Sequence, residues 1–201
     1  MTEFAPNGAV IASTDRAETD FARRNRERET KVRRVGLACF LCAISASVLV
    51  SAFGILAAII LTNGFRGGDI TSDAGFAAGA MLGAFMAAGN WVMFYVTIPL
   101  SWIAIGLSIG RFPEKRIRET GAYLRRGVIL GAATVGIVCS LLVPLVALSG
   151  SSSLNSALPL ALGGLFMGSL IGAAAGYCCA GLFTLIVRPK SQIPAIDALV
   201  F

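Results

Sequence analysis

Three long stretches of this chain contain no charged residue, and they predict membrane-spanning helices. The charge-free runs cover residues 35–61, 74–110 and 127–187. A helix needs about 20 apolar residues to cross the ~30 Å hydrocarbon layer of a bilayer. Helices also satisfy their own backbone hydrogen bonds, which lipid cannot do. The pattern therefore predicts an all-α, polytopic membrane protein.

The number of spans depends on how the two longer runs divide. The third run is interrupted at 149–156 by a Gly, Ser and Asn-rich stretch that is typical of a polar turn, which leaves spans near 127–148 and 159–187. The second run is awkward, because as one straight helix it would extend about 55 Å at ~1.5 Å per residue. Two spans and a turn would be cramped in the same length.

The distribution of basic residues favours a single crossing of the second run. Of the 17 Lys and Arg residues, 8 lie before the first run, 6 between the second and third, and 2 after the third, and Arg66 is the remaining one. One crossing places 16 on one side and 1 on the other, whereas two crossings give 8 and 9. Basic residues collect on the inner side of a membrane. We therefore expect four transmembrane helices with both termini inside.

The four spans are predicted to form two parallel in-out-in hairpins. A weak repeat supports this arrangement, because Gly79-Ala-Met-Leu-Gly83 in the first half resembles Gly164-Leu-Phe-Met-Gly168 in the second. Chance similarity between Gly/Ala-rich helices is the alternative explanation. The predicted regions are a polar, Arg-rich inner segment (1–34), the first hairpin (35–110), a basic inner loop (111–126), the second hairpin (127–187) and a short inner tail (188–201).

Two local features modify this outline. In the polar N-terminal segment, acidic residues precede basic ones by four positions, as in Asp20 and Arg24, which predicts a charged juxtamembrane helix leading into the first span. In the second span, Pro99 removes a backbone donor, so we expect the helix to kink or end near it. Leu100–Gly110 would then lie along the inner interface or pack on the bundle. The alternative is one strongly tilted helix.

Glycine recurs at every fourth position in two of the predicted spans. Residues four apart lie on one face of a helix, and a face of small residues lets another backbone approach closely in lipid. The partner helix would lie in this chain, with the second and fourth spans packed on each other, or in another chain. The helix-packing candidates are Gly75, Gly79 and Gly83 in the second span and Gly164, Gly168, Gly172 and Gly176 in the fourth.

Two polar side chains within the spans are candidates for specific contacts. Asn90 calls for a partner because an unsatisfied amide is costly in hydrocarbon. It is interpreted as an interhelical clamp, as a contact in a solute path, or as a residue near the outer headgroups. Tyr177 is the second intramembrane polar candidate. At the inner surface, four residues are candidates for contact with anionic lipid headgroups or a partner, namely Arg33, Arg34, Arg125 and Arg126.

The sequence gives little support for catalysis or metal binding. The five cysteines include a CxxC pair, Cys39 and Cys42, but this pair lies in an apolar helix and the chain has no histidine. Structural metal sites need convergent ligands, usually four. Phosphate-binding, zinc-protease and serine-hydrolase motifs are absent from the sequence. We therefore expect packing cysteines, no cofactor, no metal site, no catalytic residues and no nucleic-acid partner.

Two functions fit these expectations. The first is a non-catalytic membrane subunit or assembly factor that packs through its Gly-rich helix faces within a larger complex, with other transmembrane subunits or a second copy as its partner. The alternative is a small transporter or channel for a neutral or weakly polar solute, built from the two repeated hairpins. The expected location is a bacterial inner membrane or an organellar inner membrane.

Overall fold

The computed structural model describes residues 34–64, 74–115, 117–149 and 157–193. This part of the chain is helical and contains no strand. The predicted juxtamembrane helix, Arg33, the tips of both predicted outer loops and the end of the C-terminal tail lie outside it. Four helical stretches are long and apolar enough to cross a membrane, which indicates an integral membrane protein. They are Val35–Gly64, Gly75–Arg111, Thr120–Val146 and Ala157–Ile193.

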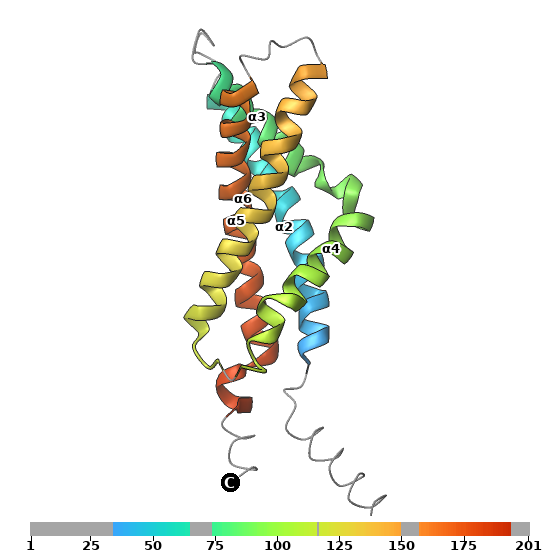
Figure 1. Cartoon of the computed structure of the whole chain (residues 1–201), viewed down its shortest axis with the longest axis vertical. Helices are drawn as coiled ribbons and strands as arrows, with labels where there is room; N and C mark the ends of the chain where they lie inside the picture. Colours follow the sequence, from blue (N-terminus) through green and yellow to red (C-terminus); the bar gives the residue numbers. More distant parts are fainter. Residues whose placement is uncertain (1–33, 65–73, 116, 150–156, 194–201) are drawn as a thin grey trace, which may run out of the picture.

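The helices run lengthwise through an elongated bundle, and successive spans run in alternating directions (Figure 1). The second span is divided into several segments, whereas each of the other three contains one long helix. The elements are α2 (Val35–Gly64), α3 (Ala74–Ala88), the 3₁₀ segment η1 (Gly89–Met93), α4 (Phe94–Leu107), the 3₁₀ turn η2 (Ile109–Arg111), α5 (Thr120–Ser149) and α6 (Ala157–Val187).

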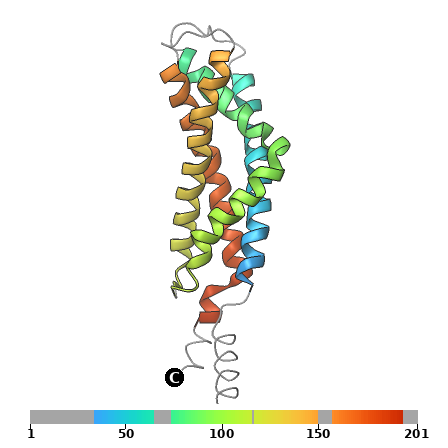
Figure 2. The same cartoon turned by 45° about the vertical axis from the view of Figure 1, so that its right-hand side comes forward.

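The second span breaks at η1 and not at Pro99, so the prediction for this helix was wrong in position. Pro99 lies inside α4, in its second turn, and the helix continues through it. The backbone instead leaves α-helical geometry at Met93, where φ is −101° and ψ is 13°. Pro99 forfeits one backbone hydrogen bond to the preceding turn, and transmembrane helices tolerate such a loss. Figure 2 shows the break projecting away from the bundle.

The third span begins earlier than the charge pattern predicted. We expected a basic loop up to residue 126 and a helix from Gly127, but α5 starts at Thr120. Arg125 and Arg126 therefore lie in its second turn, where both are exposed. The hydrocarbon layer excludes charged side chains, but a helix can extend beyond this layer and carry charges there. A charge-free run therefore predicts the part of a helix that lies in the membrane, and not the residue at which the helix begins.

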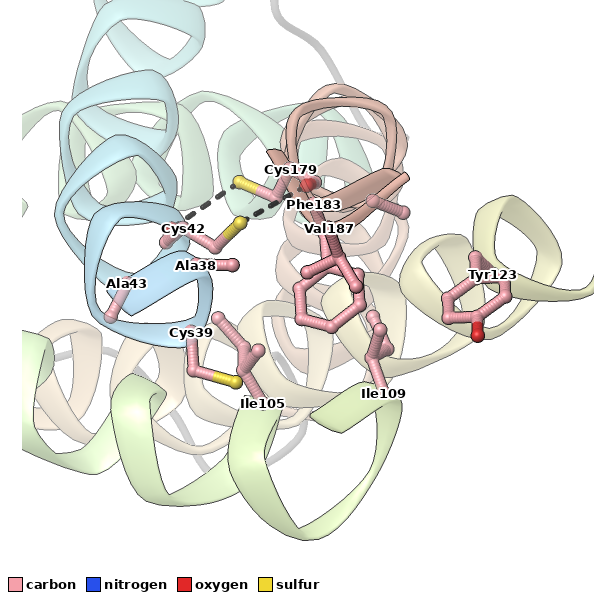
Figure 3. Packing of buried hydrophobic residues seen from close by; sticks show 11 residues of the cluster. Ala38, Cys39, Cys42, Ala43, Ile105, Ile109, Tyr123, Cys179, Phe183 and Val187 are labelled. Atoms are coloured by element: carbon pink, nitrogen blue, oxygen red, sulfur yellow. Dashed lines mark hydrogen bonds between the residues drawn. The ribbon is translucent and has the colours of Figure 1, made fainter. Parts of the chain in front are cut away.

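α6 is the central helix of the bundle, because α5, α3 and α2 all pack against it. Near one end of the bundle, α6 and α2 enclose a buried apolar cluster together with α4, η2 and α5 (Figure 3). Tyr123 and Phe183 stack there with ring centroids 5.8 Å apart, and both side chains are fully buried. This cluster fixes the ends of four helices relative to one another.

Candidate functional site

The glycine series of α6 faces α5, and its first member, Gly164, also contacts the second span at Gly83. A methyl group added at Gly168 would lie 2.8 Å from Cys139 Cβ and 2.9 Å from the Val135 carbonyl oxygen. One added at Gly176 would meet the Gly127 carbonyl oxygen and would lie 3.3 Å from Gly131 Cα. At these positions α5 and α6 are in backbone contact, which is the geometry that small residues permit in lipid.

The glycine series of α3 lies against the start of α6. A methyl group at Gly75 would lie 2.8 Å from the ring of Pro159, and one at Gly83 would lie 3.2 Å from Gly164 Cα. The partner positions rise along both helices, so α3 and α6 run side by side in the same direction. In this structure all seven predicted glycines contact helices of the same chain.

Further glycines take part in these contacts and were missed in the sequence, among them Gly136 on α5, Gly163 on α6 and the three that follow. Gly127 and Gly131 on α5 face Gly176 and Gly172 on α6, and Gly54 on α2 faces the last residues of α3. The spacing of Gly127 and Gly131 is itself a GxxxG signal that could have been recognised. Gly54 carried no such signal, because its neighbours along that face of α2 are serine and alanine.

Asn90 lies in η1 and clamps the broken span to α2. Its amide nitrogen donates a hydrogen bond to the Ser47 carbonyl oxygen at 3.1 Å. The Ser47 hydroxyl lies 3.4 Å from the hydroxyl of Thr97 on α4, so polar groups join α2 to both sides of the break. Ser47 is near the middle of α2, so Asn90 lies level with the middle of that helix.

Ser51 lies one turn further along α2 and is 7% exposed. Within the described part of the chain, its hydroxyl oxygen is buried without a hydrogen-bond partner. Hydroxyls in membrane helices usually bond back to the carbonyl four residues earlier, as Thr62 does to the Ala58 carbonyl at 2.8 Å. For Ser51 that carbonyl belongs to Ser47, which accepts the Asn90 amide. The part of α2 that faces the break therefore carries a buried hydroxyl without a hydrogen-bond partner among the described residues.

The segment that we call the arm, Gly89–Ile103, projects from the bundle at this break (Figures 1 and 2). Trp91 is 65% exposed and Tyr95 is 74% exposed. Among the described residues, the Tyr95 hydroxyl has one hydrogen-bond partner, the Met93 sulfur at 3.8 Å, which is a weak acceptor. Two aromatic rings with hydrogen-bonding groups therefore face outward next to Asn90.

Tyr177, the second predicted polar residue, is not brought together with Asn90. It is 55% exposed on α6, next to Gly176, which contacts Gly127 near the start of α5. The exposed phenol therefore lies at the level of Gly127 on α5.

Four of the five cysteines are buried between helices, and Cys178 is exposed. The Cys42 thiol donates to the Cys179 carbonyl oxygen at 3.3 Å, and the Cys179 thiol donates to the Cys42 carbonyl oxygen at 3.5 Å (Figure 3). This reciprocal contact joins α2 to α6 across 137 positions of sequence. Among the described residues, no group of three or more His, Cys, Asp or Glu side chains is arranged to hold a metal ion.

The predicted lipid-contact residues that the structure describes lie at one end of the bundle. Arg34 precedes α2, and Arg125 and Arg126 lie in the second turn of α5, which begins at the same end (Figure 1). All three side chains are exposed.

Comparisons with protein-family models, curated proteins and solved structures find no match to this chain.

Proposed function

We propose that this chain is a non-catalytic integral membrane subunit or assembly factor that binds another transmembrane helix through its arm. From the sequence, the Gly-rich helix faces were the expected binding surface for a partner subunit. In the structure, the Gly-rich faces of α3 and α6 are occupied by helices of the same chain. They hold the subunit together, and a partner uses a different surface.

The observation that carries this proposal is the position of Trp91 and Tyr95. Both rings are exposed next to Asn90, which contacts the middle of α2. At mid-depth, lipid tails offer no acceptor for an indole N–H or a phenol O–H, and burying such a group without a hydrogen bond is costly. Aromatic residues that face only lipid collect instead at the two interfaces. A neighbouring helix with carbonyl or hydroxyl acceptors would satisfy both groups.

The Tyr95→Phe variant tests this proposal, because it removes only the hydroxyl. We expect the variant to fold normally and to recover less of the partner when the full-length protein is purified in mild detergent and its mass is measured. Tyr177→Phe is the matched control, since it removes the same hydroxyl from an exposed tyrosine outside the arm. Purification of wild-type protein as a lone symmetric oligomer, or equal recovery of partner by both variants, would contradict the subunit assignment.

A transporter or channel for a neutral or weakly polar solute is the second candidate. It is favoured by the break in the second span, because interrupted helices with polar groups near the midplane form the binding sites of many transporters. The groups in question are the Asn90 amide and the hydroxyls of Ser47, Ser51 and Thr97. The absence of charge from the three apolar runs would restrict the solute to an uncharged molecule.

Liposome swelling distinguishes the two candidates. Full-length protein in liposomes would be exposed to gradients of glycerol or urea, and light scattering would follow the volume. A carrier or channel predicts uptake above that of empty liposomes, and Asn90→Leu should abolish it without unfolding the protein. The subunit proposal predicts swelling equal to that of empty liposomes for both proteins.

Location and orientation complete the proposal. The basic end of the bundle, where α2 and α5 begin and α6 ends, is proposed to face the cytoplasm or its organellar equivalent, in a bacterial or organellar inner membrane. The support is the excess of basic residues in the segments that adjoin this end. Both termini would then lie inside.

A further inference from the structure

A wide, shallow depression of about 540 Å³, called the cavity below, lies at the basic end of the bundle. It lies between the connection that leads into α5 and the turn that follows α6, two segments that are close together in both views of the fold (Figures 1 and 2). Its lining combines two cationic side chains with one carboxylate and the first residues of α5. The lining residues are Arg118, Glu119, Thr120, Gly121 and Lys190.

Both walls of the cavity are anchored to the buried core. On the α5 side, the Tyr123 hydroxyl donates to the Ile117 carbonyl oxygen at 2.9 Å, and its ring packs edge-on against Phe112 with centroids 5.3 Å apart. Tyr123 is fully buried, so the backbone next to Arg118 is held in place. The positions of Arg118 and Glu119 in the cavity wall therefore follow from the packing beneath them.

The opposite wall is held by the end of α6. The Gln192 side-chain amide donates to the Val187 carbonyl oxygen at 2.7 Å, which satisfies one of the carbonyls left free at the helix end. Ile193 is 2% exposed and anchors the turn from the far side. Along the chain, Lys190 lies between Val187 and Gln192, the two residues that this hydrogen bond joins. The turn consequently presents Lys190 towards the cavity from a fixed backbone.

The cavity lies at the depth of lipid headgroups. Arg118 and Glu119 directly precede the span that starts at Thr120, and Lys190 follows the last residue of α6 by three positions. Charged side chains at such positions sit in the interfacial layer, because hydrocarbon excludes them. The molecules that fill this layer are phospholipid headgroups.

We propose that this cavity binds the headgroup of a phospholipid carrying a primary ammonium group, such as phosphatidylethanolamine. Arg118 and Lys190 match the phosphate, since guanidinium and ammonium groups form charge-assisted hydrogen bonds with phosphate oxygens. Glu119 matches the ammonium group. A purely anionic headgroup leaves that carboxylate without a partner, and the quaternary ammonium of phosphatidylcholine cannot donate a hydrogen bond to it. The lining therefore favours a headgroup with both charges and N–H donors.

Lipid titration of the full-length protein, followed by native mass spectrometry, tests this site. The probes are phosphatidylethanolamine, phosphatidylcholine and phosphatidylglycerol with identical acyl chains. We expect phosphatidylethanolamine to bind most tightly. Glu119→Gln should weaken its binding about three-fold, as for one partly solvated charge pair, and leave phosphatidylglycerol binding undiminished. Replacing Arg118 and Lys190 together by glutamine should weaken the binding of all three lipids.

Lys115→Gln is the matched control, because Lys115 is an exposed cation in the same connection that does not line the cavity. It should leave the order of the three lipids unchanged. Glycerophosphoethanolamine, the headgroup without tails, should compete with the lipid, whereas inorganic phosphate should not. Equal binding of the three lipids, wild-type selectivity in Glu119→Gln, or competition by inorganic phosphate alone would overturn the proposal.

Discussion

Adding one methyl group at Gly172 should force α5 and α6 apart. In Gly172→Ala the new carbon would lie 2.7 Å from the Gly131 carbonyl carbon and 2.9 Å from Val135 Cβ. Carbon atoms in favourable contact are about 3.5–4.0 Å apart, so the helices must separate by about 1 Å at this level. Overpacking of this kind costs about 1–3 kcal/mol. The atoms that collide belong largely to backbone, which cannot rotate away.

Gly181→Ala provides the control on the same helix, because no atom lies within 4 Å of the methyl group added there. Both variants gain the same helix propensity, about 1 kcal/mol relative to glycine, so the difference between them isolates the contact. At about 2–4 °C per kcal/mol for a chain of this size, Gly172→Ala should melt roughly 2–12 °C below Gly181→Ala. Circular dichroism of both proteins in one detergent measures this. Identical melting temperatures would refute the tight contact.

Three further predictions concern the break and the topology. Ser51→Ala should raise the melting temperature, because it removes a buried hydroxyl that has no partner among the described residues, which should increase the free energy of unfolding by about 1–3 kcal/mol. A lower melting temperature would indicate that a bound molecule forms a hydrogen bond with the hydroxyl. Asn90→Leu should weaken the contact between α2 and η1 by about 0.6–2 kcal/mol, measured by thermal or denaturant unfolding. In intact cells, with the native cysteines replaced, an impermeant thiol reagent should label Ser152→Cys but not Thr120→Cys. Labelling of Thr120→Cys would refute the four-span topology with inner termini.

The spans could be predicted from the sequence because the membrane acts on composition directly. Hydrocarbon excludes charge, so the three charge-free runs, the polar stretch at 149–156 and the distribution of basic residues predicted four spans without any knowledge of packing. Glycines at period four marked helix faces for the same local reason, since residues four apart share a face. The sequence favoured packing of the second and fourth spans on each other, as the α3 series shows, but it did not indicate that the α6 series faces α5. The α6 series contacts α5 and the α3 series contacts α6, and this choice depends on how all the helices share the available space.

The break in the second span was decided by tertiary contacts. From the sequence, Pro99 was the expected breaking point, because proline acts through its own backbone. In the structure Gly54 lets the end of α3 approach α2, and the Ser47 carbonyl accepts the Asn90 amide. The chain therefore bends at η1, beside those contacts, and continues as a helix through Pro99.

The cavity at the basic end could likewise not be predicted from the sequence. Arg118 and Lys190 are separated in sequence by α5 and α6. The residues around either one do not indicate that the other lies nearby in the fold. They come together because α5 and α6 form an antiparallel pair with matched lengths, held by glycine contacts along both helices. Local composition thus determined which segments lie in the membrane, and long-range packing determined which side chains meet.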